Sequence, residues 1–306
     1  MPVYNGERYL KDAIDSILGQ TFEDLELLIV DNASTDATPL IASEYGARDP
    51  RLKYVRFREN YGPAHNWNAS FKLSSGRYFK WAAYDDVCAP EFIERCVAVL
   101  DKNPSAVLAY PLTVGIDETG QRIGIPAVVG PGYEPTEDYV DQTQASLRLM
   151  TSEDPVSRFR SLLHALWNAH FLYGVIRSDV LARSSLHPSH YAGDHLLLAE
   201  LSLYGPFCQV PEELFFLRIH RERTSQTQSL RTLTGGGPAH SAGRVWWKLR
   251  HGYPQRLGAY MAAVARSPLG RFQRMRCYAE IFTAAAGWTR AKAAESYRRR
   301  IAAPVE

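Results

Sequence analysis

The stretch LELLIVDNASTDAT, residues 25–38, decides the fold prediction. Five of its first seven residues are apolar, including the unbroken run Leu27 to Val30, which is typical of a strand buried on both faces of a parallel sheet. The remaining residues form a polar turn rich in helix-starting side chains. Helices are predicted on either side, over residues 6–20 and 39–47, because apolar residues recur there at helical spacing.

The same alternation continues along the first third of the chain. We predict strands at residues 1–4, 51–57, 77–84 and 106–112, and helices at 63–76 and 90–103. Strands that alternate with helices favour a parallel sheet covered on both faces. The sequence therefore predicts an α/β fold with a doubly wound, mostly parallel, Rossmann-like sheet.

The pattern is looser after residue 113. Residues 121–152 are rich in Gly and Pro, and a helix is predicted over 155–170. A strand leading into a helix follows at 173–181, then an amphipathic helix at 193–205 and a strand at 213–220. The segment LTGGGPAHSAG, residues 233–243, is the best candidate for a linker.

Composition narrows the class of protein. With 306 residues, 45% of them hydrophobic, the chain can bury a large core. Its four cysteines form no CxxC pair, so a zinc site or a disulfide framework is not expected. No apolar run reaches the length of a membrane-spanning helix, and charged residues interrupt the first segment where a signal peptide would lie. We expect a cytoplasmic protein.

The charge is unevenly distributed. Residues 240–303 carry a net charge of +11, although the whole chain carries only +2. Aromatic side chains are interleaved with these basic residues, as in helices that lie on anionic lipid. A helical cap with a solvated basic face would have the same composition. We expect no nucleic-acid partner, because no binding motif accompanies the charge.

Four polar clusters follow the predicted strands: Tyr4-Asn5, Asp31-Asn32, Glu59-Asn60 and Asp85-Asp86. Ligands of such sheets bind outside the carboxyl ends of the strands. The sequence contains no GxGxxG after the first strand, no GxxxxGK[ST] and no GxSxG. Without a glycine-rich cradle, an Mg²⁺ or Mn²⁺ ion held by Asp side chains could neutralise a bound diphosphate.

Four segments, MPVYNGERYL, LLIVDNASTDAT, NYGPAHNWN and AAYDDVCAPEFIE, occur in the order and spacing found in family-2 glycosyltransferases. The chain resembles that family over about residues 1–225. The resemblance implies a GT-A fold, a nucleoside-diphosphate-sugar donor and a divalent cation, Mn²⁺ or Mg²⁺. Relatives usually have several more residues before the MPVYN equivalent, so we expect a shortened first strand.

The resemblance also assigns site residues. Asp86 and His220 would hold the metal, and Asp194 would be the catalytic base. The residues expected to contact the nucleotide sugar are Pro2, Tyr4, Asn5, Asp31, Asn60, Asp85 and Arg218. Simpler roles remain open for several of them. Asp31, Asp85-Asp86 and Asp194 could merely cap helices, Asn60 could belong to a plain turn, and His220 and Arg218 could lie in a basic surface loop.

The predicted function is transfer of a sugar to an acceptor hydroxyl, with inversion at the anomeric carbon as the family resemblance implies. The acceptor would be a glycan or a lipid-linked molecule of the cell envelope, reached from the inner face of the plasma membrane. A catalytically silent sugar-nucleotide-binding module and a nucleotidyltransferase are the alternatives. The expected domain (1–230) has a nucleotide-sugar half (about 1–115) and an acceptor half (about 116–230). A linker (231–243) and a basic helical extension (244–306) follow.

Overall fold

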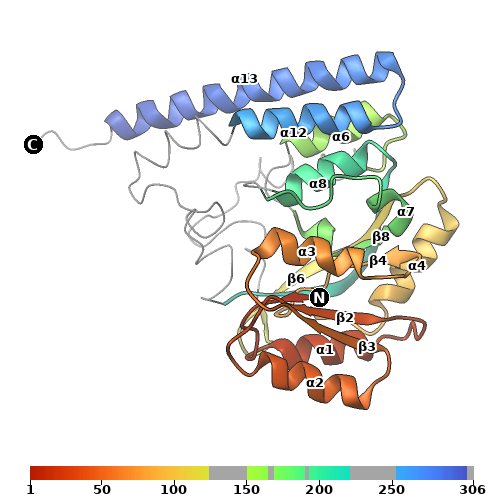
Figure 1. The fold of residues 1–306 in the computed structure, drawn as a ribbon. Coiled ribbons are helices and arrows are strands. Elements are labelled where there is room, and N and C mark those ends of the chain that lie inside the picture. The colour runs from red at the N-terminus through yellow and green to blue at the C-terminus, as the bar shows by residue number, and fades with distance from the viewer. Residues whose placement is uncertain (124–149, 165–168, 190–192, 221–252, 302–306) are drawn as a thin grey trace, which may run out of the picture.

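The computed structural model describes residues 1–123, 150–164, 169–189, 193–220 and 253–301. The predicted linker and the basic loop after residue 220 lie outside these residues. The described part consists of two sheets with helices packed around them, and a pair of helices at the C-terminal end (Figure 1).

The first sheet is parallel, in the order β1-β2-β3, and is built from β1 (Pro2–Val3), β2 (Leu27–Asp31) and β3 (Leu52–Arg56). All five residues of β2 are buried, as its apolar sequence predicts. Helices alternate with these strands: α1 (Leu10–Leu18), α2 (Thr38–Arg48) and α3 (Pro63–Lys72). The register pairs Val3 with Asp31 and Asp31 with Arg56, which aligns the carboxyl ends of the three strands.

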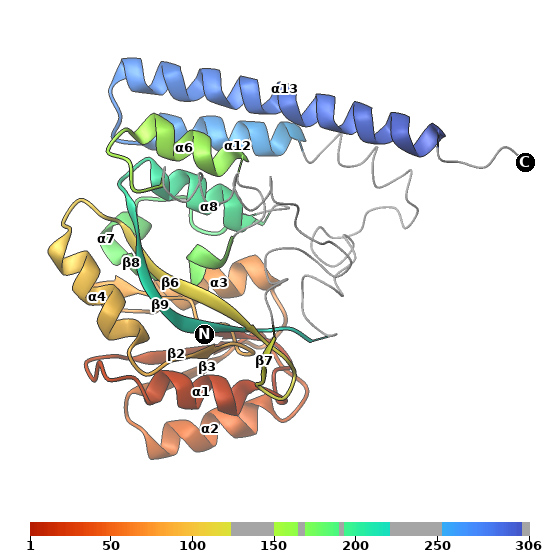
Figure 2. The same ribbon diagram turned by 180° about the vertical axis from the view of Figure 1, so that it is seen from behind.

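The second sheet is mixed, in the order β4-β8-β6-β9-β5, with β7 paired to β6. Its strands are β4 (Tyr78–Phe79), β5 (Val87–Cys88), β6 (Leu108–Ile116), β7 (Arg122–Ile123), β8 (Val175–Arg177) and β9 (Phe207–Arg218). Only β6 and β9 pair in parallel, and they run side by side along the sheet (Figure 2).

Two details of the prediction are wrong. The strands form a parallel three-stranded sheet and a separate mixed sheet, not one mostly parallel sheet. The strand predicted over 77–84 stops at Phe79, because its partner strand β8 is short and pairs with it only at Arg177 and Ile176. The α/β class itself is confirmed.

Further helices cover the second sheet: α4 (Phe92–Lys102), α6 (Pro155–His164), the 3-10 helix η1 (Ala169–Tyr173), α7 (Ser178–Leu181) and α8 (Gly193–Ser202). The helix α8 was predicted to be amphipathic, but every residue from Leu196 to Ser202 is buried. It is enclosed because α6, η1 and α12 (Tyr253–Arg266) all pack against it.

The C-terminal helices α12 and α13 (Arg271–Ile301) lie together on the outside of α6 and α8 (Figures 1 and 2). Tyr260 on α12 and Cys277 and Ile281 on α13 are fully buried in the same apolar cluster as the residues of α8. Arg266 on α12 also contacts the buried carboxylate of Glu200 at 2.9 Å. The described part of the extension therefore shares the core of the second sheet.

Candidate functional site

The acidic pair Asp85-Asp86 lies in the connection between β4 and β5. Strand β5 pairs antiparallel with β9, with Val87 opposite Phe216, and this pairing brings the end of β9 to the acidic residues. The Arg218 backbone N–H donates to Asp86 Oδ1 at 3.0 Å. His220 Nε2 lies 3.0 Å from Asp85 Oδ2. Four predicted site residues from distant parts of the chain are thus brought together.

The side chain of Arg218 is buried and bonded to the protein. Its Nε donates to the Asp85 carbonyl (2.9 Å) and its Nη2 to Asp12 Oδ2 (3.0 Å), and the guanidinium lies over the Tyr9 ring, 4.7 Å from its centroid. Arg218 therefore holds the acidic pair against the start of α1. Its predicted contact with the nucleotide stays a prediction. Asp12 was not predicted as a site residue from the sequence. It lies within the helix predicted over residues 6–20, where polar residues are expected on the exposed face.

The loop after β1 is fixed to the loop after β2. The Asn5 N–H donates to Ser34 Oγ (2.9 Å), and Asn5 Oδ1 accepts the Thr35 N–H (2.8 Å). Asn5 has a φ of 51°, in the left-handed region that Asn tolerates better than most residues. Pro2 is buried in β1 opposite Val30, whereas the ring of Tyr4 is 45% exposed. Tyr4 and Asn5 are both exposed and so offer surface to a ligand, whereas Pro2 does not.

Asp31 is fully buried and bonded on both oxygens. Its Oδ1 accepts the Ser34 N–H (2.8 Å), and its Oδ2 accepts the Tyr54 hydroxyl (2.7 Å) and lies 3.3 Å from Arg56 Nε. Burial, and then the bond to Asp31, raise the pKa of Tyr54 well above its ordinary value. Asp31 therefore orders the turn after β2 but does not cap the next helix, α2, whose N-cap residue is Ala37. A contact between Asp31 and the nucleotide base stays a prediction.

Asn60 is exposed and organises the loop after β3. Its Oδ1 accepts a bond from Asn32 Nδ2 (2.8 Å) and one from the Gly62 N–H (2.8 Å). Asn32 Oδ1 in turn accepts the Tyr61 N–H (2.9 Å). Asn32 therefore joins the loops after β2 and β3. Its position directly after Asp31 is the sequence signal that could have revealed this role.

The loops after β1, β2 and β3 contact the acidic pair and His220 through residues near the start of the chain. A Cβ on Gly6 would lie 2.8 Å from the Tyr84 ring, so the loop after β1 lies in close contact with the residue before the acidic pair. The Tyr9 ring lies 4.8 Å from the His220 ring, centroid to centroid. The loops after β1, β2 and β3 are thus joined to the cluster of Asp85, Asp86 and His220.

Asp194 lies in the first turn of α8, where a carboxylate is stabilised by the helix dipole. Its side chain is about half exposed, and its Oδ1 lies 3.5 Å from His187 Nε2. Partial burial would raise the pKa of Asp194. The hydrogen bond from His187 and the charges of His187 and His195 outweigh that effect and hold the pKa below its ordinary value. Asp194 is therefore an ionised carboxylate at neutral pH.

His187 was not found from the sequence, where it is one of three histidines between residues 187 and 195 and belongs to no motif. Its backbone N–H donates to Asn68 Oδ1 (2.9 Å) and its carbonyl accepts Asn68 Nδ2 (2.9 Å). The His187 ring packs on Trp67 at 5.3 Å between centroids, and its Nδ1 lies 3.1 Å from the Pro188 carbonyl. Both ring nitrogens of His187 thus lie next to oxygen atoms, Nε2 beside Asp194 Oδ1 and Nδ1 beside the Pro188 carbonyl. The ring of His187 is fixed in place beside Asp194.

The residues around the acidic pair fit a divalent cation in their chemistry. Carboxylate oxygens are the ligands that Mg²⁺ prefers, and imidazole nitrogen also binds Mn²⁺. His220 Nδ1 is buried and has no hydrogen-bond partner among the residues that the structure describes. Within the same residues, however, no group of three or more acidic, His or Cys side chains converges as a complete metal site. Asp86 and His220 are thus suitable ligands that do not by themselves complete a coordination shell.

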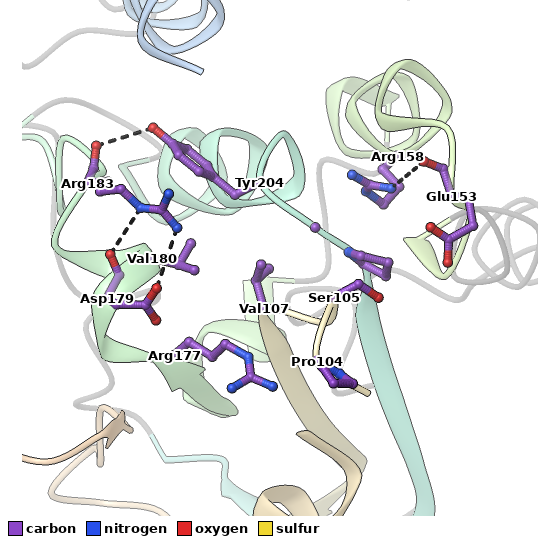
Figure 3. Close-up of a pocket in the computed structure, with 12 residues that line it drawn as sticks. Pro104, Ser105, Val107, Glu153, Arg158, Arg177, Asp179, Val180, Arg183 and Tyr204 are labelled. Carbon is purple, nitrogen blue, oxygen red and sulfur yellow. Dashed lines mark hydrogen bonds and ion pairs between the residues drawn. The ribbon is translucent and has the colours of Figure 1, made fainter. Parts of the chain in front are cut away.

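A cavity of about 300 Å³ lies at the opposite end of β9 (Figure 3). Its walls include Arg158, Arg177 and Tyr204. Because β9 has twelve residues, this cavity lies roughly 35 Å from Arg218. Arg158 Nε donates to the Ser202 carbonyl (2.8 Å) and Arg177 Nη2 to the Leu100 carbonyl (2.7 Å). These arginines cap the C-terminal ends of α8 and α4, so the cavity is separate from the cluster of predicted site residues.

The sequence profile described as "Glycosyl transferase family 2" matches residues 1–155, about half of the chain. The chain belongs to this family. The profile covers the loops after β1, β2 and β3 and the acidic pair, whereas Asp194, Arg218 and His220 lie beyond it.

Curated relatives of this family include an uncharacterized glycosyltransferase of Haemophilus influenzae, 29% identical over 224 residues, which are 72% of this chain and 65% of the relative. A chondroitin synthase of Escherichia coli is 27% identical over 225 residues, 74% of this chain and 29% of that protein. The matches thus span less than two thirds of the length of these relatives.

Two solved structures resemble the chain in fold. S. aureus TarS 1-349 has a TM-score of 0.57 at 17% identity, covering 95% of this chain and 71% of that chain. The Pyrobaculum calidifontis mannosyltransferase PcManGT, in complex with GDP-Man and Mn²⁺, has a TM-score of 0.52 at 18% identity, covering 93% and 84%. At these identities the likeness establishes the GT-A fold alone, as predicted.

Within the described residues, no helix is both long enough and apolar enough to cross a membrane.

Proposed function

We propose that the chain is a glycosyltransferase that moves a sugar from a nucleoside-diphosphate sugar to an acceptor hydroxyl. One observation carries this proposal: the loops after β1, β2 and β3 contact the cluster that holds the acidic pair. Gly6 lies against Tyr84, and the Tyr9 ring lies against the His220 ring. The solved mannosyltransferase with GDP-Man and Mn²⁺ supports a donor and a cation of this kind.

In the proposed complex, Tyr4 and Asn5 lie against the nucleotide, beside the buried carboxylate of Asp31. Asn60 lies at the edge of the base or ribose. Asp85 faces the ribose and diphosphate, and Arg218 keeps the acidic pair in place. Asp86 and His220 would hold Mn²⁺ or Mg²⁺, and such an ion neutralises charge on a leaving diphosphate.

Asp194 is proposed as the general base. An ionised carboxylate can take the proton of an acceptor hydroxyl as its oxygen bonds to the anomeric carbon. The bond between that carbon and the diphosphate breaks on the opposite side, so the configuration is inverted. The nucleoside diphosphate leaves with the electron pair of the broken bond, and Asp194 keeps the proton. His187 fixes the orientation of the Asp194 carboxylate through their contact at 3.5 Å.

The proposed acceptor is a glycan or lipid-linked molecule of the cell envelope. The E. coli chondroitin synthase, a polysaccharide synthase by name, supports a polymer-forming role. We place the reaction in the cytoplasm, at the inner face of the plasma membrane, where the four free cysteines would stay reduced.

The test is release of nucleoside diphosphate from a panel of nucleotide sugars, with Mn²⁺ and with EDTA. We expect release from one donor that depends on the cation. Asp86→Ala should abolish the donor-dependent rise in melting temperature. Asp194→Asn should retain that rise but lower turnover about 10²–10⁴-fold, which is the usual contribution of a general base. Stabilisation by a donor without any turnover would instead identify a silent binding module, and unchanged turnover in Asp194→Asn would overturn the base assignment.

A further inference from the structure

The outer face of α13 carries apolar side chains in contact with solvent. Phe272 and Met275 are the most exposed large hydrophobic side chains in the described part of the chain, at 74% and 68%, and Phe282 is 56% exposed. Ala279 and Ala286 are exposed on the same helix. We call these five residues the α13 stripe.

The spacing of the stripe places it on one side of the helix. Its positions are separated by three, four, three and four residues, which is the repeat of a single helical face. The inward side is formed by Cys277, Ile281 and Ala284, all fully buried. At about 100° per residue, the two sets point in nearly opposite directions. The stripe therefore plays no part in the packing of α13 on α6 and α12.

The position of α13 in the fold makes this face accessible. The helix is the outermost element at its end of the molecule, and α12 and α6 both lie on its inner side (Figure 1). From Phe272 to Ala286 the stripe is roughly 20 Å long. A patch of this kind on a soluble protein marks an interaction surface.

The charge of α13 identifies the kind of partner. The helix contains eight Arg or Lys residues against two Glu residues. One of these acids, Glu280, is mostly buried and pairs with Arg160 on α6, so its charge is neutralised on the inner side. Among the side chains that the structure describes, Arg271 is exposed next to Phe272, and Arg276 is exposed next to Met275 although it also contacts Asp154 at 3.4 Å. An apolar stripe bordered by cations is the pattern of a helix that lies in the interface of an anionic membrane.

We propose that the α13 stripe docks the protein on anionic phospholipid. Phe272, Met275 and Phe282 insert among the acyl chains near the headgroups, and the exposed side chains of Arg271 and Arg276 contact lipid phosphates. A second copy of this chain fits the surface less well, because pairing two such helices would bring two strongly cationic surfaces together. The inference rests on α13 alone and does not require the proposed sugar transfer.

The experiment is vesicle flotation with the whole chain. Vesicles of phosphatidylcholine mixed with phosphatidylglycerol should bind the protein, and pure phosphatidylcholine vesicles should bind it much more weakly. The double variant Phe272→Ser with Phe282→Ser should lose about tenfold in affinity for each phenylalanine removed. Leu40→Ser with Leu73→Ser is the matched control, since those side chains are 62% and 51% exposed on other elements, and it should bind as the unaltered protein does.

Three readouts keep the outcome decisive. Melting temperature should be unchanged in both double variants, because all four side chains are exposed. Donor-dependent stabilisation should persist in the Phe272/Phe282 variant, which separates a failure of docking from a failure of the proposed function. Absence of binding to anionic vesicles, or binding unaffected by the two Ser substitutions, would overturn the proposal. So would a dimer in solution that those substitutions dissociate, because the stripe would then be a subunit interface.

Discussion

The ion pair between Glu200 and Arg266 tests whether the C-terminal helices belong to the folded core. Glu200 on α8 is 1% exposed, and its Oε1 accepts a hydrogen bond from Arg266 Nε (3.0 Å) and lies 2.9 Å from Arg266 Nη2. Its other oxygen accepts the N–H and hydroxyl of Ser185 (3.0 and 2.5 Å). Arg266→Met would leave a buried carboxylate bonded on one side only.

The expected cost follows from this geometry. Removing one partner of a buried ion pair costs about 3–5 kcal/mol. The Arg266 side chain is 43% exposed, so water can reach part of the site, and we discount the cost to about 2–3 kcal/mol. For a chain of this size, that loss lowers the melting temperature by about 5 °C. Glu200→Gln in the Arg266→Met background removes the unpaired charge and should restore part of the stability.

Urea denaturation of the four proteins in this double-mutant cycle measures the coupling directly. We expect a coupling energy of about 2 kcal/mol between Glu200 and Arg266. The pair Arg183–Asp179 is the control, because both side chains are more than half exposed, and it should give less than about 0.5 kcal/mol. If the effects of Glu200→Gln and Arg266→Met simply add, the two residues are not coupled and the extension is not held to the core in this way.

Two further predictions concern the site. His187→Ala removes a contact that lowers the pKa of Asp194, so this pKa should rise. The fall of kcat/KM on acidification reflects protonation of Asp194. It should therefore occur at a higher pH in the variant than in the unaltered enzyme. A profile that superposes on the original would contradict the role of His187. Gly6→Ala places a Cβ 2.7 Å from a Val3 methyl carbon and 2.8 Å from the Tyr84 ring, so the loop must move, and donor affinity should fall about tenfold. Gly258→Ala on α12, where the added carbon meets no atom within 4 Å, is the control for this substitution and should keep full donor affinity.

The local part of the fold could be predicted from the sequence because its signals are local. The strand over residues 25–31 was found as Leu27–Asp31 and that over 51–57 as Leu52–Arg56, since a run of apolar residues specifies burial wherever it lies. The polar clusters at the strand ends, Asn5 and Asp31 among them, were found from the same local pattern, and the structure joins Asn5 to Ser34 and Thr35 in the turn after Asp31.

The directions of the later strands could not be predicted in this way. Nothing near residues 78–79 shows that β4 will pair with β8, about a hundred residues later in the chain. The burial of α8 was missed for the same reason, because it depends on α12, which comes from the extension. Such pairings depend on tertiary packing, which overrides local periodicity.

The register between β5 and β9 decides whether the predicted site residues meet. With Val87 opposite Phe216, the N–H of Arg218 reaches Asp86, and His220 reaches Asp85. A slip of one residue would turn the side chain of Arg218 to the other face of the sheet, because successive side chains of a strand alternate. Arg218 would then lose Asp12 and the Tyr9 ring and would become a buried cation without a carboxylate. The same arginine that orders the acidic pair therefore also penalises the wrong register.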